Sequence, residues 1–136
     1  MKMEKLRVLL VDDEEEFVNT LAERLQLRNI IPLVATDGNE ALRIIDAERP
    51  PVVVMDVMMP GMGGLAVLRQ VKNSYPKIQV ILLTGQGSTQ DGIKGMRIGA
   101  FDYLMKPVRI EGLIQKMNEA FQASKQNEDK TGTTRP

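Results

Sequence analysis

Short apolar runs that alternate with amphipathic segments constrain this chain more than any other feature. The apolar runs cover residues 6–11, 30–35, 52–55, 79–83 and 101–105. All five runs are short, and the first four are rich in valine, isoleucine or leucine, as buried strands of a parallel sheet are. Apolar residues at helical spacing fall within residues 14–28, 37–47, 65–71, 88–96 and 110–121. The pattern therefore predicts five strand–helix units.

Five such units predict a single α/β domain. Parallel strands need right-handed crossovers, so the helices must cover both faces of one sheet. The expected fold is a doubly wound (βα)5 three-layer sandwich of the flavodoxin-like class, and the strand order 2-1-3-4-5 suits five strands. We expect the domain to span residues 4–124, and residues 125–136 to form a polar disordered tail or the start of a linker.

Two of the expected helices have recognisable starts. Asp37, with Glu40 three residues later, is typical of a helix N-terminus. Ser88 or Thr89 is expected to cap the fourth helix, which follows the fourth apolar run.

Composition excludes several classes of function. The 136-residue chain contains no cysteine and no histidine, and its formal net charge is zero. These absences exclude disulfides, thiolate or imidazole metal sites and a histidine general base. Zero net charge gives no bulk attraction to nucleic acid or to an anionic membrane. No apolar stretch approaches the roughly 20 residues that span a bilayer, so we expect a cytoplasmic protein.

Polar residues follow four of the five apolar runs. Asp12 and Asp13 follow the first run, Asp56 the third, Thr84 the fourth and Lys106 the fifth. In a doubly wound sheet, the carboxyl ends of the strands meet at one edge, where ligands bind. The sequence therefore predicts that these five side chains form one site.

The residue types indicate phosphoryl chemistry. Three converging carboxylates repel one another unless a cation neutralises them, and an all-oxygen ligand set favours Mg²⁺. Lys106 supplies a positive charge and Thr84 a hydroxyl donor, which together could hold a phosphoryl group. Asp56 is the best candidate nucleophile because it stands alone at the end of its run.

Together these motifs resemble those of a known family, the receiver domains of two-component response regulators. The matching segments are Val11-Asp12-Asp13, Asp56-Val57-Met58-Met59-Pro60-Gly61, Thr84-Gly85 and Lys106-Pro107. They occur in the family's order and at its strand positions, over residues 4–124. The strand order 2-1-3-4-5 is inherited from this resemblance as much as from topology.

The resemblance implies a phosphorelay function. Asp56 would accept a phosphoryl group from a phosphohistidine on a sensor histidine kinase or a phosphotransfer protein. Asp13 and Asp56 would bind Mg²⁺ directly, Asp12 through a water molecule, and Met58 through its backbone carbonyl. The protein would catalyse its own phosphorylation and slow dephosphorylation, and would not be a metabolic enzyme.

The resemblance also implies a conformational switch. Thr84 and Lys106 would contact the phosphoryl oxygens, and Tyr103 would turn inward as Thr84 moves. The Lys106-Pro107 peptide bond would be cis. The face formed by the fourth helix, fifth strand and fifth helix would then control an unidentified protein partner or pair in a homodimer. The chain fits either a stand-alone regulator or a receiver cut from a longer one.

Simpler interpretations remain open for single residues. Asp12 and Asp13 would also suit the start of a helix. Thr84 before glycine is a common turn residue, Lys106 a common loop lysine and Tyr103 a common packing aromatic.

A degenerate receiver that acts only as a protein-interaction module is the main alternative function. A haloacid dehalogenase phosphatase needs a second aspartate two residues after the nucleophile, and a flavodoxin needs a phosphate loop without the acidic run found here.

Two further features bear on the lifetime of the phosphorylated state and on the stability of the fourth helix. Met58 and Gln86 flank the site where the family varies to set phosphoryl lifetime, and we expect Met58 to limit the approach of water to the phosphoryl group. Gly92 and Gly95 each weaken the fourth helix by roughly 0.5–1 kcal/mol relative to alanine. They either let that helix rearrange or permit close packing.

Overall fold

The computed structural model describes residues 5–85 and 89–133, with side chains as far as residue 125. Five parallel strands form one sheet in the order β2-β1-β3-β4-β5, which confirms the predicted order. The strands are β1 (Arg7–Val11), β2 (Ile31–Ala35), β3 (Val52–Asp56), β4 (Gln79–Thr84) and β5 (Asp102–Met105). The helices are α1 (Glu15–Gln26), α2 (Gly38–Glu48), α3 (Gly64–Ser74), α4 (Thr89–Ile98) and α5 (Ile110–Thr133).

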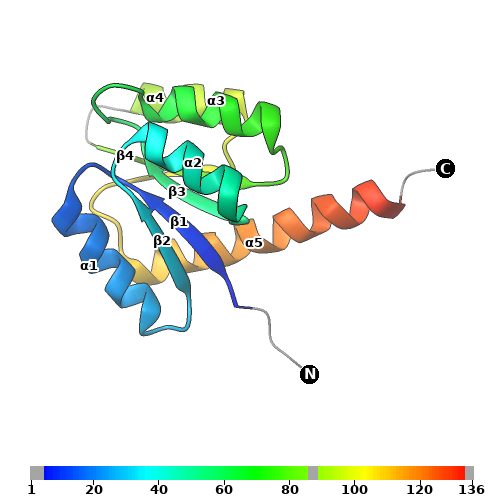
Figure 1. Ribbon diagram of the computed structural model, residues 1–136, viewed down its shortest axis with the longest axis horizontal. Coiled ribbons are helices and arrows are strands. Elements are labelled where there is room, and N and C mark those ends of the chain that lie inside the picture. The colour runs from blue at the N-terminus through cyan, green and yellow to red at the C-terminus, as the bar shows by residue number, and fades with distance from the viewer. Residues whose placement is uncertain (1–4, 86–88, 134–136) are drawn as a thin grey trace.

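The sheet lies between two layers of helices, with α2, α3 and α4 on one face and α1 and α5 on the other (Figure 1). The central strand β3 is buried along its whole length and alternates between the two hydrophobic cores. Val53 and Met55 face the first core, whereas Val52 and Val54 face the second. The strand is therefore held rigidly from both sides. Within the described residues, no helix is long and apolar enough to cross a membrane.

The start of α2 confirms the predicted capping pattern. The backbone N–H of Glu40 donates to the Asp37 Oδ1 atom at 2.8 Å, and Asp37 is the N-cap residue. The Glu40 side chain accepts from the backbone N–H of Thr36 at 2.8 Å. The first bond satisfies a backbone donor that the first helical turn leaves free, and the second holds the residue before the N-cap against the helix. Helix α4 begins at Thr89, and Ser88 lies outside the described residues.

The glycines of α4 permit a close approach to the sheet. A Cβ atom added to Gly92 would lie 2.6 Å from Cδ2 of Tyr103, and one added to Gly95 would collide with Leu82. Both glycines are buried. The close-packing account of these glycines is therefore supported, and the idea that they loosen the helix stays a prediction.

Helix α5 continues to Thr133, beyond residue 125 where the sequence predicted a disordered tail. The apolar pattern marked this helix only as far as residue 121, and the nature of residues 125–136, a polar tail or the start of a linker, stays a prediction. Apolar periodicity marks only the part of a helix that packs on a core, and lysine, glutamine and glutamate continue a helix readily without it. The domain limits of 4–124 remain a prediction.

Candidate functional site

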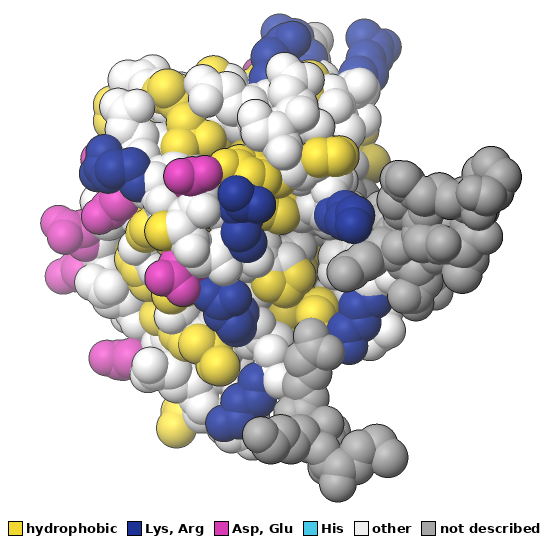
Figure 2. Space-filling view, turned by 45° about the vertical axis from the view of Figure 1, so that its right-hand side comes forward, with side chains coloured by type: hydrophobic (Ala, Val, Ile, Leu, Met, Phe, Trp, Pro, Cys, Tyr) yellow, Lys and Arg dark blue, Asp and Glu magenta, His cyan; other side chains and the backbone are white. Residues whose placement is uncertain are grey.

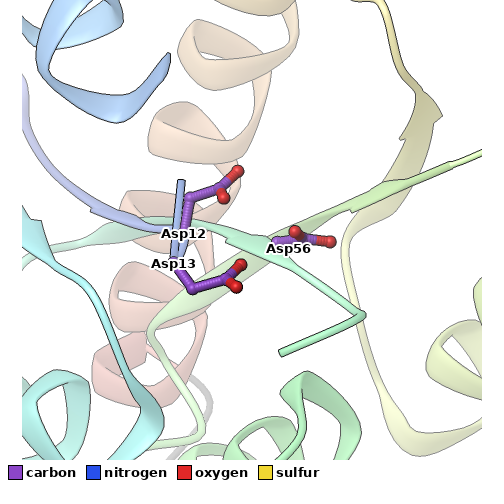
Figure 3. A group of neighbouring side chains, drawn as sticks. All are labelled: Asp12, Asp13 and Asp56. Carbon is purple, nitrogen blue, oxygen red and sulfur yellow. The ribbon is translucent and has the colours of Figure 1, made fainter. Parts of the chain in front are cut away.

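Three carboxylates meet at the carboxyl edge of the sheet. Asp12 and Asp13 directly follow β1, Asp56 ends β3, and Val11 pairs with Met55 across these neighbouring strands. One oxygen atom from each carboxylate lies within 4.8 Å of the others (Figure 3). Asp12 is 2% exposed and Asp56 6% exposed, while Asp13 is exposed to solvent. The sequence-based prediction that these three residues cluster is consistent with this geometry.

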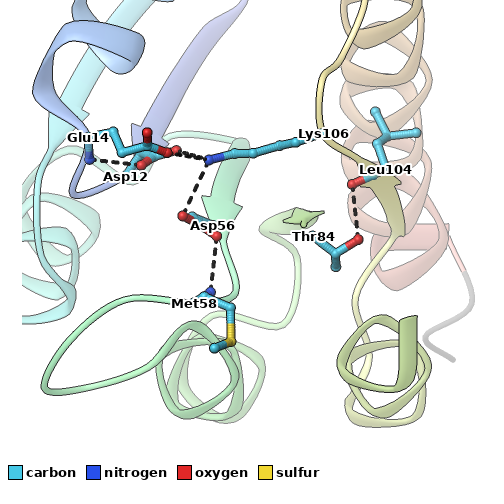
Figure 4. Close-up of polar contacts among 7 residues, drawn as sticks. All are labelled: Asp12, Glu14, Asp56, Met58, Thr84, Leu104 and Lys106. Atoms are coloured by element: carbon cyan, nitrogen blue, oxygen red, sulfur yellow. Dashed lines mark hydrogen bonds and ion pairs between the residues drawn. The ribbon is translucent and has the colours of Figure 1, made fainter. Parts of the chain in front are cut away.

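Lys106 reaches across the edge of the sheet into this cluster. Its Nζ atom lies 2.8 Å from Asp12 Oδ2, 3.1 Å from Glu14 Oε1 and 3.4 Å from Asp56 Oδ2 (Figure 4). The backbone is anchored as well, because the Lys106 N–H donates to the Thr84 carbonyl at 2.7 Å. The Lys106–Pro107 peptide bond is cis, as the family resemblance implied.

The charge of Lys106 is secured by its partners. Burial by itself would lower the pKa of Lys106, but the hydrogen bonds to Asp12 and Glu14 outweigh this effect. The pKa of the ammonium group is therefore raised above its ordinary value of 10.5. The side chain stays positively charged at every pH at which the protein would work.

For Asp56, unlike Lys106, the effect of burial on the pKa is larger than the opposing effect of its partners. Burial raises the pKa of its carboxyl group above the ordinary 3.8, and the neighbouring charge of Asp12 acts in the same direction. The Met58 N–H, which donates to Asp56 Oδ1 at 3.0 Å, and the Lys106 ammonium lower the pKa but do not fully compensate. The ionised carboxylate would thus be stabilised further by additional positive charge at the site.

The two aspartates that follow β1 differ in their contacts. Both oxygens of Asp12 are used, because Oδ1 accepts the backbone N–H of Glu14 at 2.9 Å and Oδ2 accepts from Lys106. Within the part of the chain that the structure describes, Asp13 has no hydrogen bond or ion pair. Neither aspartate provides a cap to the first turn of α1, whose N-cap residue is Glu14. Asp13 is therefore the member of the cluster whose carboxylate has no partner among the described residues.

Thr84 and Tyr103 lie outside the carboxylate cluster. The buried Thr84 hydroxyl donates to the Leu104 carbonyl at 3.5 Å and points toward β5, away from Asp56 (Figure 4). The half-buried Tyr103 ring packs against Gly92 of α4. The structure thus brings together Asp12, Asp13, Asp56 and Lys106. The two expected switch residues lie on the neighbouring strands β4 and β5, where Thr84 pairs with Met105 and Tyr103 pairs with Leu82.

Sequence reasoning missed two neighbours of Lys106. One is Glu14, which directly follows the two aspartates, so the continuous acidic run was a usable signal. The other is Phe17, whose ring centroid lies 4.6 Å from Lys106 Nζ. Phe17 fits the apolar face of α1 equally well, and helical periodicity alone could not reveal this contact with a cation.

Of the two residues expected to flank the site, Met58 and Gln86, the structure describes only Met58. The Met58 side chain is 60% exposed, and its N–H contacts Asp56. The role of its carbonyl as a metal ligand remains a prediction. Gln86 lies outside the described residues.

The donor set fits a hard divalent cation. Three carboxylates supply only oxygen ligands, and the chain has no histidine or cysteine to favour a softer metal. Asp13 offers an oxygen that no other described group occupies. The site residues therefore match the needs of Mg²⁺.

Curated relatives are response regulators. The response regulator MprA of Mycobacterium ulcerans (strain Agy99) is 35% identical over 124 residues, covering 91% of this chain and 53% of the relative. A putative NtrX-like response regulator of Rickettsia typhi (strain ATCC VR-144 / Wilmington) is 34% identical over 125 residues, covering 90% of this chain and 26% of the relative. The chain spans about half or less of the length of these relatives.

Solved structures of response regulator receiver domains have the same fold. A response regulator receiver domain protein from Clostridium thermocellum has a TM-score of 0.85 and 34% identity, covering 88% of this chain and 97% of that one. The receiver domain of NtrX from Brucella abortus has a TM-score of 0.81 and 29% identity, covering 85% and 98%. A sequence model of the response regulator receiver domain matches residues 8–118. Since that match covers most of the chain and agrees with the strand order, this chain belongs to the response regulator receiver domain family.

Proposed function

We propose that Asp56 accepts a phosphoryl group from a phosphohistidine of a sensor histidine kinase or phosphotransfer protein. The observation that supports this most directly is the position of Lys106, whose ammonium group lies between Asp12 and Asp56. A fixed cation beside the accepting carboxylate at a strand end suits an aspartyl phosphate, because the product carries more negative charge than the carboxylate alone.

The transfer step uses one carboxylate oxygen of Asp56. That oxygen attacks phosphorus, the new O–P bond forms, and the P–N bond to the donor imidazole breaks. The electron pair of the broken bond goes to the imidazole nitrogen, which takes up a proton. Lys106 neutralises charge on the transferred phosphoryl oxygens, and the Met58 N–H holds the other carboxylate oxygen in place.

Mg²⁺ fits the same proposal. Asp13 and Asp56 would hold it directly, Asp12 through a water molecule and Met58 through its backbone carbonyl. The ion would supply positive charge that offsets repulsion between the carboxylates and the phosphoryl oxygens. Asp12 is already bound to Lys106, which agrees with an indirect role for Asp12.

The switch would involve Thr84 and Tyr103. The Thr84 hydroxyl makes a long 3.5 Å bond to the Leu104 carbonyl, which is weak enough to be exchanged for a phosphoryl oxygen. Tyr103 contacts Gly92, so a movement near Thr84 can be transmitted to α4. We propose that the face of α4, β5 and α5 then controls a protein partner, or pairs with a second copy of the chain.

The test is phosphorylation by acetyl phosphate in the presence of Mg²⁺, measured by intact-protein mass spectrometry. Wild type should gain the mass of one phosphoryl group, and Asp56→Asn should gain none. Glu23→Gln is a matched control, because it removes an exposed carboxylate of α1 far along the helix from the cluster. If wild type gains no mass, the proposal fails and the degenerate receiver, a protein-interaction module alone, becomes the better account.

A further inference from the structure

A second concave site lies on the helical layer formed by α3 and α4. It is a surface groove of about 420 Å³ between the two helices. Its lining residues are Arg69, Lys72 and Asn73 from α3, and Lys94, Arg97 and Ile98 from α4. None of them belongs to the carboxylate cluster, so the charge of this groove does not depend on phosphorylation of Asp56.

The groove carries an unbalanced positive charge. Four of its six lining residues are cationic and none is acidic. Within residues 5–85 and 89–125, Arg69, Lys94 and Arg97 form no ion pair, whereas Arg7 and Lys116 elsewhere are paired with Glu48 and Asp102. Since the whole chain has a formal net charge of zero, this is a local feature rather than general basicity.

Lys72 differs from the other three cations. Its Nζ atom donates to the Pro76 carbonyl at 2.9 Å and to the Ile78 carbonyl at 3.0 Å. Burial lowers the pKa of this lysine. Lys72 therefore holds the segment that follows α3 in place. The three exposed cations, Arg69, Lys94 and Arg97, are the ones available to bind a ligand.

The cations are arranged in two rows. Arg69 and Lys72 are three residues apart on α3, and Lys94 and Arg97 are three residues apart on α4, so each pair shares one helix face. Helices α3 and α4 lie side by side (Figure 1). In Figure 2 Lys and Arg side chains lie at the top of the visible face and also in its middle and lower parts, while the Asp and Glu side chains lie mostly toward the left. Like charges on the two helices repel one another, and an anionic chain lying between them would relieve this repulsion.

We propose that this groove binds an acidic, Asp- or Glu-rich segment of a partner protein. A surface groove between two helices accommodates a linear segment with several carboxylates better than a single small anion. Among the described residues that line the groove, Ile98 is the only apolar one, and none carries an aromatic ring that could stack on a nucleotide base.

The proposal is tested by titrating the ¹⁵N-labelled full chain with an octaglutamate peptide at low ionic strength. Backbone amide shifts should concentrate in the second half of α3 and in α4. The variant Arg69→Gln/Arg97→Gln should bind on the order of fivefold more weakly or worse, because two ion pairs are lost. Both arginines are exposed, so the variant should keep the wild-type circular dichroism spectrum.

The control variant Arg24→Gln/Arg43→Gln removes the same charge from exposed positions on α1 and α2 and should bind the peptide as wild type does. Equal weakening in both variants would overturn the proposal, because the attraction would then be non-specific. A short DNA duplex is titrated in the same way, to test whether the groove prefers nucleic acid to an acidic peptide. Tighter binding of the duplex than of the peptide, lost in Arg69→Gln/Arg97→Gln alone, would overturn the choice of a protein partner.

Discussion

At the scale of single residues, the site is organised by one cation that several carboxylates share. Lys106 contacts Asp12, Glu14 and Asp56 at once, so a change in one carboxylate alters the attraction available to the others. Glu14 differs from the two aspartates, because its side chain is mostly exposed. It therefore competes for Lys106 without being part of the buried cluster.

We predict that Glu14→Gln speeds phosphorylation of Asp56 by acetyl phosphate about two- to fivefold at low salt. The substitution removes a negative charge that repels the anionic donor and shares Lys106, and exposed charge pairs have effects of this order. Quenched time courses followed by intact mass would measure the rate. Glu23→Gln should leave the rate unchanged, and the gain should shrink in high salt. A slower rate for Glu14→Gln would contradict the competition between Glu14 and the phosphoryl group.

The raised pKa of Asp56 leads to a prediction about stability. Burial raises this pKa in the folded state above the ordinary 3.8, so the folded protein binds this proton more readily than the unfolded chain. The contribution of Asp56 to stability therefore falls as pH rises from 3.8 through the raised pKa, and the penalty is complete above it. Without Mg²⁺, Asp56→Asn should be more stable than wild type at neutral pH, and the difference should disappear toward pH 3.8.

Urea unfolding monitored by circular dichroism across this pH range would measure the difference. Glu23→Gln serves as the control for loss of an exposed carboxylate, and its stability difference should show no comparable dependence on pH. A difference between Asp56→Asn and wild type that grows as pH falls would have the wrong sign and would contradict the prediction.

At the scale of secondary-structure elements, the close contact between α4 and β5 can be tested by substitution. We predict that Gly92→Ala destabilises the protein by about 1–2 kcal/mol. The added Cβ would lie 2.6 Å from Cδ2 of Tyr103, and the cost of overpacking exceeds the gain in helix propensity. In a Tyr103→Ala background the same substitution should instead stabilise the protein by roughly 0.5–1 kcal/mol.

Gly112→Ala on α5 is the matched control, because nothing lies within 4 Å of the added Cβ. It should stabilise the protein by roughly 0.5–1 kcal/mol, which is the helix-propensity gain alone. Urea unfolding of wild type, Gly92→Ala, Tyr103→Ala and the variant with both substitutions gives a double-mutant cycle for Gly92 and Tyr103. A Gly92→Ala variant that behaves like Gly112→Ala would show that the ring yields at no cost.

Elements whose signals are local were predictable from sequence. The capping pattern of Asp37 and Glu40 and the buried strand Val52–Asp56 depend on neighbouring residues, and both are observed. The clustering of Asp12, Asp56 and Lys106 followed from strand order. The contact between Gly92 and Tyr103 could not be deduced, because it depends on how closely a helix approaches a sheet. The end of α5 was missed because a polar helix carries no apolar periodicity.

At the scale of the whole molecule, the parallel sheet gathers residues that lie far apart in the sequence. Asp12 and Lys106 are 94 residues apart, yet their side chains are in contact at 2.8 Å. Both cores pack against β3, so the strand that carries Asp56 is held from both faces. A ligand that bridges the ends of β1 and β3 should therefore stabilise the folded state as a whole.

We predict that Mg²⁺ raises the free energy of unfolding by about 2.7 kcal/mol at a concentration of 100 times Kd. An ion bound by Asp13 and Asp56 binds the folded state and not the unfolded chain, so the thermal midpoint should rise by several degrees. Thermal unfolding with MgCl₂, and with NaCl at equal ionic strength, would separate binding from screening. Asp13→Asn should lose most of the shift, and its own stability should change little, because the exposed Asp13 has no bond within the described chain. If Asp13→Asn kept the full shift, the ion would have to bind elsewhere.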